Sequence, residues 1–148
     1  MNICTAETVR LMSKVFLDTS YAVALSARTD QNHEPAIKLA RKLRESSTQI
    51  ITTRAVLLEI GNALARVRHR EAAVKLLSAL ENDPKVEILP ASDDLYQRAF
   101  EIYSERVDKE WGLINCMSFV AMTEQGITDA LTADKHFQQA GFQALLLQ

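Results

Sequence analysis

Three acidic side chains lie where they could together hold a metal ion. Asp18 ends the apolar run KVFLD, and Asp134 follows the apolar run DALT. Glu59 lies inside AVLLEIGNALA, a mostly apolar stretch with helical composition, and the small residues Ala55 and Ala63 lie one turn to either side of it. This leaves room for the Glu59 carboxylate to face a cavity. Because an unpaired buried carboxylate is costly, Glu59 needs a cation or a hydrogen-bonding partner.

Asn115 is a fourth candidate for the same pocket. It is the most polar residue of the apolar run WGLINCMSFVAM. Three carboxylates and one amide, all oxygen ligands, suit a hard cation such as Mg²⁺ or Mn²⁺. They do not suit structural zinc, which prefers cysteine and histidine. The three histidines have no metal-ligand spacing; they are His33, His69 and His136.

Each of these residues also has a plainer interpretation. Either aspartate alone is typical of a helix N-cap. Glu59 would equally fit the rim of a buried stripe, paired with Arg66, and Asn115 would fit a buried amide that binds a backbone group. Three hydroxyls beside the aspartates would either orient the acids or simply cap helices; they belong to Thr19, Ser20 and Thr132.

The elements that must position these residues alternate between strands and helices. We expect strands at 14–18, 49–52, 86–89, 129–132 and 142–147. We expect helices at 19–28, 32–45, 53–68, 70–80, 92–106 and 113–124, and a short turn at 133–141. This order predicts an α/β fold with a mainly parallel sheet covered by helices. In such sheets, sites lie beyond the carboxyl ends of the strands, which is where Asp18 and Asp134 fall.

Length and composition predict one domain in a reducing compartment. The chain has 148 residues, and we assign 12–148 to a single domain and 1–11 to an N-terminal extension or leader. Cys4 and Cys116 form no disulfide framework. No apolar run reaches the ~20 residues that span a bilayer, and no secretory signal is present, so we expect a cytoplasmic protein without membrane contact. The net charge is −2, so any nucleic acid must bind a local basic patch.

Four motifs together resemble the PIN domain family. VFLDTSYA, LLEIGNAL, WGLINCMSFVAM and ALTADKHFQQAGF occur in the order typical of that family, and the resemblance covers 14–147. The chain is most similar to the VapC-like toxins within it. The resemblance implies a Rossmann-like α/β/α sandwich and a Mg²⁺- or Mn²⁺-dependent endoribonuclease. It also implies a cognate antitoxin that inhibits the enzyme and, often, a homodimer. The helices expected around 34–44 and 71–80 are amphipathic and would offer an apolar groove to an antitoxin segment.

The family's acidic residues correspond to Asp18, Glu59 and Asp134 in this chain. The remaining position is normally an aspartate, and Asn115 occupies it here; Gly112 stands where a serine is usual. Replacing aspartate by asparagine keeps the shape but removes a negative charge. We therefore expect weakened metal binding and slow or absent RNA cleavage. A rival interpretation is a non-catalytic PIN-like module that binds RNA or a protein partner.

Two other classes of α/β protein fit less well. DNA-directed nucleases of this fold usually carry helical insertions, for which the chain has no room, and response-regulator domains need paired acids after the first strand. For RNA contact the candidates are Arg54, Arg66 and Arg68, of which Arg54 and Arg66 are expected on the helix of Glu59. A second basic run is more typical of a solvated helix face; it comprises Arg41, Lys42 and Arg44.

Overall fold

A computed structural model describes residues 13–148, and the expected leader, 1–11, lies outside them. The strands are β1 (Lys14–Leu17), β2 (Gln49–Thr53), β3 (Val86–Leu89), β4 (Asp129–Leu131) and β5 (Gln143–Ala144). The helices are α2 (Thr19–Ser26), α3 (His33–Arg44), α4 (Arg54–Ala63), α5 (Val67–Asn82), α6 (Asp93–Glu105), α7 (Leu113–Gln125) and α8 (Lys135–Gln139). A 3₁₀ helix, η1 (Leu145–Leu147), follows β5.

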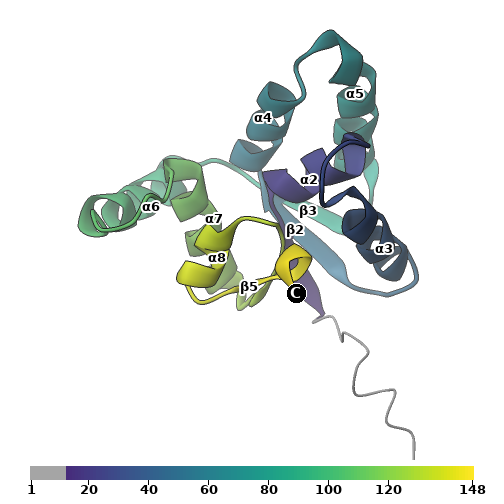
Figure 1. The fold of residues 1–148 in the computed structure, drawn as a ribbon. Coiled ribbons are helices and arrows are strands. Elements are labelled where there is room, and N and C mark those ends of the chain that lie inside the picture. The colour runs from purple at the N-terminus through teal and green to yellow at the C-terminus, as the bar shows by residue number, and fades with distance from the viewer. Residues whose placement is uncertain (1–12) are drawn as a thin grey trace, which may run out of the picture.

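The five strands form one parallel sheet in the order β3-β2-β1-β4-β5. The central strand β1 is almost fully buried: Val15 and Phe16 are inaccessible to solvent. Helices α2 to α5 contact one another on one side, and α6, α7 and α8 do so on the other, with α4 also reaching α7 (Figure 1). The result is the expected α/β/α sandwich. Because all strands run in the same direction, their carboxyl ends share one edge.

The helix expected at 53–68 ends earlier, at Ala63. Leu64 and Arg66 leave the helical conformation, and α5 starts at Val67. The expectation that Arg66 shares the helix of Glu59 is therefore wrong. The segment ALARVR has good helix propensity, but propensity is a weak preference that tertiary packing overrides. Here the chain turns back so that α5 can pack beside α2 and β3 (Figure 1).

The end of the chain also differs from expectation. The expected turn at 133–141 contains the helix α8, and the expected strand at 142–147 pairs only over Gln143–Ala144. Its neighbour β4 has just three residues, so little backbone remains for pairing. The next residues coil into η1, which buries both Leu145 and Leu146; an extended strand would point them to opposite faces.

Two further expectations concern cysteine and membranes. Cys116 is a buried free thiol on α7, as expected for a core residue, and Cys4 lies outside the described residues. Within residues 13–148, no helix combines the length and the apolar character needed to cross a membrane.

Candidate functional site

The Asp18 carboxylate is buried at the point where β1 ends and α2 begins. Its Oδ2 accepts hydrogen bonds from the hydroxyls of Thr132 (2.6 Å) and Ser20 (3.1 Å), and the side chain is only 4% exposed. It also accepts from the backbone N–H of Ser20 (3.4 Å), so Asp18 caps α2 as well. Burial raises the pKa of Asp18 above its ordinary range, and the hydroxyl donors oppose this in part. A cation or a proton at this carboxylate would relieve the cost of its burial.

Glu59 is held by the residue that follows Asp18. The Thr19 hydroxyl donates to Glu59 Oε1 at 2.5 Å, which joins the start of α2 to the middle of α4. Glu59 is partly exposed. Arg66, its alternative partner, forms no ion pair with any residue of 13–148. The Glu59 side chain therefore lies beside the start of α2 rather than along its own helix toward Arg66.

Asp134 caps α8 and is linked to Asp18 through Thr132. Its Oδ1 accepts from the backbone N–H of His136 (2.8 Å) and lies 3.1 Å from the Nδ1 of the same histidine. The backbone N–H of Asp134 donates to the Thr132 hydroxyl (3.0 Å), which in turn donates to Asp18. His136 has no metal-ligand spacing in the sequence, but its place two residues after an N-cap aspartate brings its backbone and ring to Asp134.

Asn115 faces Asp134 with its N–H group and the backbone with its oxygen. Its Nδ2 donates to Asp134 Oδ2 (3.3 Å), and its Oδ1 accepts from the backbone N–H of Gly112 (3.0 Å). Both interpretations made from the sequence therefore apply: the amide binds a backbone group at the start of α7 and also points into the acidic site. Asn115 is partly exposed, which the apolar run around it did not suggest.

Hydrogen bonds and one peptide link connect all four residues expected in the metal pocket. The connection runs from Glu59 through Thr19 to Asp18, and from there through Thr132 and Asp134 to Asn115. Ser20 strengthens it, because its hydroxyl contacts that of Thr132 (2.9 Å) and accepts from the backbone of residue 133 (2.8 Å). The fold thus brings these side chains to the carboxyl edge of the sheet.

The donors fit a hard divalent cation in kind, but they do not lie close enough together to hold one. Asp18, Glu59 and Asp134 offer carboxylate oxygens, the ligands that Mg²⁺ and Mn²⁺ prefer. Asn115 offers an N–H group, because its oxygen is engaged by Gly112. In the described part of the chain, no three His, Cys, Asp or Glu side chains lie close enough to one another to hold a metal ion. Asp18, Glu59 and Asp134 therefore do not converge on one cation position in this structure.

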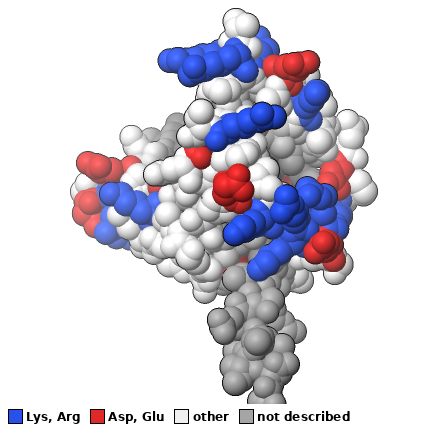
Figure 2. All heavy atoms as spheres, turned by 45° about the vertical axis from the view of Figure 1, so that its right-hand side comes forward, with Lys and Arg blue, Asp and Glu red and all other residues white. Residues whose placement is uncertain are grey.

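Many of the basic residues lie in two groups at the surface, and others lie near α6 and pair with acids (Figure 2). Figure 2 shows one group at the upper end, around the turn between α4 and α5, and a larger group over α3. Of the expected RNA contacts, Arg54 starts α4 and pairs with Glu81, whereas Arg66 precedes α5 and Arg68 lies in its first turn. The run Arg41, Lys42 and Arg44 occupies the last turn of α3.

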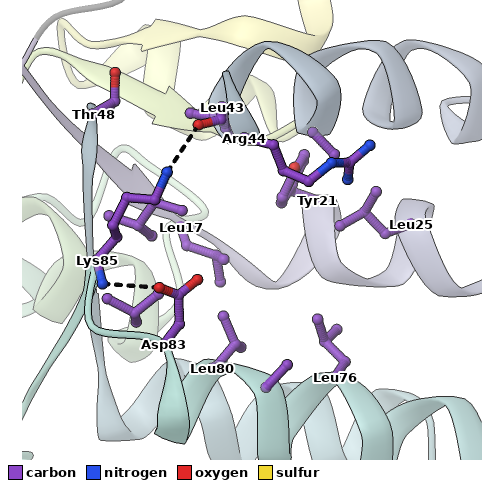
Figure 3. A pocket seen from close by; sticks show the side chains of 14 residues that line it. Leu17, Tyr21, Leu25, Leu43, Arg44, Thr48, Leu76, Leu80, Asp83 and Lys85 are labelled. Atoms are coloured by element: carbon purple, nitrogen blue, oxygen red, sulfur yellow. Dashed lines mark hydrogen bonds between the residues drawn. The ribbon is translucent and has the colours of Figure 1, made fainter. Parts of the chain in front are cut away.

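An apolar cleft of about 210 Å³ opens between α2, α3 and α5. Leu76 and Leu80 of α5 point across it toward β1 and α2 (Figure 3). Its rim is polar and carries Arg44, Asp83 and Lys85. The backbone N–H of Lys85 donates to Asp83, and its ammonium group donates to backbone carbonyls at the end of α3 (Figure 3). The cleft therefore offers apolar side chains inside and two cations at its mouth.

Comparison with known proteins identifies related chains. The family model for the PIN domain matches residues 15–143. The "23S rRNA-specific endonuclease VapC20" of Mycobacterium tuberculosis, in strains CDC 1551 and H37Rv, is 30% identical over 129 residues, which are 86% of this chain and 95% of that protein. The crystal structure of M. tuberculosis VapC20, described as a sarcin-ricin loop cleaving toxin, is similar with a TM-score of 0.78 and 28% identity; the match covers 87% of this chain and 96% of that one. The expected fold is confirmed.

Proposed function

This chain belongs to the PIN domain family, and from that premise we propose that it is a VapC-type endoribonuclease whose activity is reduced by Asn115. The observation that carries the proposal is the connected set Asp18, Glu59, Asp134 and Asn115 at the carboxyl edge of the sheet. The substrate would be RNA in the cytoplasm, and the reaction the hydrolysis of a phosphodiester bond. The relative named for 23S rRNA supports RNA as the substrate class.

In this proposal the three carboxylates would hold Mg²⁺ or Mn²⁺, and binding would draw them closer together than they lie in this structure. The bound cation would supply Lewis-acid stabilisation of the charge that develops on the scissile phosphate. The chain's own hydroxyls keep the carboxylates in position: Ser20 and Thr132 donate to Asp18, and Thr19 donates to Glu59. One of the carboxylates would orient or deprotonate the attacking water.

Asn115 weakens this site in two ways. The amide is neutral, so the site has one negative charge fewer than an all-carboxylate site. Its N–H group also donates to Asp134 Oδ2, and a cation must displace that hydrogen bond to use the same oxygen. Substitution of groups that merely orient metal ligands typically costs 10- to 100-fold in metal affinity or activity. A lost ligand should cost at least about 10-fold.

The test is RNA cleavage by the Asn115→Asp variant. With Mg²⁺ or Mn²⁺ present, we expect at least about 10-fold faster cleavage of labelled RNA than with the unchanged chain. Substrates should include 23S rRNA and an unrelated RNA. The double variant Asp18→Asn with Asn115→Asp should be inactive, which controls for contaminating nucleases. Equal rates for the unchanged chain and Asn115→Asp would refute the role of this position.

A second candidate function is non-catalytic binding of RNA or a protein partner. The observation in its favour is that Asn115 satisfies Asp134 without any cation. RNA that binds Asn115→Asp and stays intact with either metal would establish this function instead.

We also propose that an antitoxin segment with apolar residues and a flanking acid binds the cleft between α2, α3 and α5. The leucines that line the cleft fit the apolar residues, and Arg44 and Lys85 at the rim fit the acid (Figure 3). The groove expected between the helices around 34–44 and 71–80 would be this cleft. Burial raises the pKa of Tyr21 in this cleft above its ordinary range.

Substitution inside the cleft tests this proposal. In the Asn115→Asp background, Leu76→Arg should keep RNA cleavage but lose inhibition by the co-expressed cognate antitoxin. Leu58→Arg is the matched control, because Leu58 is 64% exposed on α4 and lies outside the cleft. If the antitoxin inhibits Leu76→Arg as strongly as Leu58→Arg, the segment does not bind here.

A further inference from the structure

A second cleft, of about 330 Å³, lies between the end of α2 and the start of α5. Two arginines, one histidine and two hydroxyl residues line it: Arg28, Arg68, His69, Ser26 and Thr29. No acidic residue is among them. The lining therefore consists of hydrogen-bond donors and positive charge, which is the composition that recognises an oxyanion.

The charged groups of this cleft are not engaged by the protein itself. Within residues 13–148, the side chains of Arg28, Arg68 and His69 form no ion pair and no hydrogen bond with one another or with any other residue. Some other arginines of the described residues are engaged, since Arg54 pairs with Glu81 and Arg98 pairs with Glu124, whereas Arg66 is unpaired like Arg28 and Arg68. An arginine that is left unpaired beside a second one repels it, and this repulsion favours a bound anion.

The cleft and the acidic site lie at opposite ends of the same helix. Asp18 caps the first residue of α2, and Ser26 is its last residue. Eight residues of α-helix are roughly 12 Å long. Stacked nucleotides advance about 3.4 Å each, so three to four nucleotides of one strand would connect the two places. The turn between α4 and α5 brings Arg68 and His69 to this end of α2.

We propose that this cleft binds a backbone phosphate of the RNA, a few nucleotides from the bond at the acidic site. Arg28 and Arg68 supply charge-assisted hydrogen bonds, His69 donates from its imidazole, and the hydroxyls of Ser26 and Thr29 complete the donors. The cleft reads the phosphate and not the base, so it positions RNA without selecting sequence. The identity of the ligand as RNA rests on the function proposed above, whereas the phosphate site itself does not.

The first test uses inorganic phosphate and the unchanged chain. We expect a phosphate titration to shift the backbone amide NMR signals of 26–29 and 67–69 progressively. The signals around Asp18 and Asp134 should not follow the same curve. In the double variant Arg28→Ala with Arg68→Ala, the shifts should disappear. Signals of 26–29 and 67–69 that do not move with phosphate would overturn the site, whatever the protein does with RNA.

The second test uses fluorescein-labelled single-stranded RNA in EDTA, so that binding is measured by anisotropy without cleavage. Each lost phosphate contact on a single strand lowers the salt slope of binding by about 0.7, which is about 5-fold in affinity at 0.1 M salt. The double variant should therefore bind about 25-fold more weakly and with a shallower salt slope. The control is Arg41→Ala with Lys42→Ala, which removes two charges from α3.

The outcomes separate this proposal from the function on which it builds. If RNA affinity falls equally in both double variants, the general charge of the protein explains it and the cleft is not an RNA subsite. If phosphate binds the cleft but RNA does not bind the chain, the proposed ribonuclease function fails. The cleft is then a site for free phosphate. Loss of RNA affinity in the Arg28 and Arg68 variant alone supports the proposal in full.

Discussion

At the scale of single residues, Asn115 supplies a hydrogen-bond donor to the acidic site in the absence of a cation. Asp18 is buried and gains hydroxyl donors, and Asp134 gains donors from the start of α8. Asn115 adds one more donor, to Asp134 Oδ2. In an aspartate, a negatively charged carboxylate oxygen would take the place of the Nδ2 group of Asn115. Under the proposed function, we therefore expect the asparagine to favour the metal-free protein and an aspartate to favour the metal-bound one.

Asn115→Asp should therefore lower the stability of the metal-free protein. In EDTA, the variant should unfold at lower urea concentration, with a loss of about 1–2 kcal/mol, because a hydrogen bond is replaced by like-charge repulsion. Millimolar Mg²⁺ or Mn²⁺ should restore the loss by binding the folded state, and should stabilise the unchanged chain less. Asn115→Ala should show no such rescue. A variant as stable as the unchanged chain in EDTA would contradict this account.

At the scale of elements, α4 positions Glu59 and its start is held by Thr53. The Thr53 hydroxyl accepts from the backbone N–H of Val56 (3.2 Å), and Thr53 is completely buried at the end of β2. The helix ends at Ala63, and α5 then leads the chain back to β3. Glu59 therefore lies near the middle of a ten-residue helix whose start is attached to the sheet.

Loss of this cap should reduce both stability and activity. Thr53→Ala should cost about 1 kcal/mol in the free energy of unfolding, measured with urea, and Thr53→Ser should cost less because it keeps the hydroxyl. In the Asn115→Asp background, Thr53→Ala should also slow RNA cleavage. Ser92→Ala is the matched control, since Ser92 caps α6 through Leu95 (3.1 Å) and α6 carries no site residue. Equal activity losses in the two alanine variants would show that α4 has no special role.

At the scale of the whole molecule, charge and apolar surface are unevenly distributed. Basic residues gather over α3 and around the α4–α5 turn in spite of the net charge of −2 (Figure 2). On α6, three aromatic side chains lie on one face and are 42–48% exposed, with neighbouring ring centroids 6.1 and 6.3 Å apart: Tyr96, Phe100 and Tyr103. Acids outnumber bases on α6, so this aromatic face is unsuited to RNA and fits a protein surface.

We expect the aromatic face of α6 to be the contact in a homodimer. The unchanged chain should have the mass of a dimer in light scattering after gel filtration, because burial of three half-exposed aromatic side chains favours association. Phe100→Glu should give a monomer that remains folded. Val74→Glu, an exposed position on α5, should leave the dimer intact. A monomer at micromolar concentration before any substitution would rule out this assembly.

Much of the fold and of the acidic site was predictable from local pattern. The run KVFLD and the alternation of strands and helices place Asp18 at the carboxyl end of a central strand, because periodicity and composition act over a few residues. The end of α4 at Ala63 was not predictable in the same way, since ALARVR is a good helical segment. The two-residue length of β5 likewise depends on how far β4 extends, and the sequence of β5 does not reveal this.

The sequence by itself therefore indicated which oxygen-bearing side chains belong to the candidate site and predicted a mainly parallel sheet, and its resemblance to the PIN family marked Asn115 as a position where an aspartate is usual. Only the tertiary structure decided that the amide of Asn115 donates to Asp134, that Arg66 lies apart from Glu59, and that Arg28 and Arg68 share one cleft. The physical reason is the distance along the chain over which each effect acts. Propensity, capping and apolar periodicity operate between near neighbours in the chain, whereas these contacts join residues that packing of α2, α5, α7 and α8 brings together.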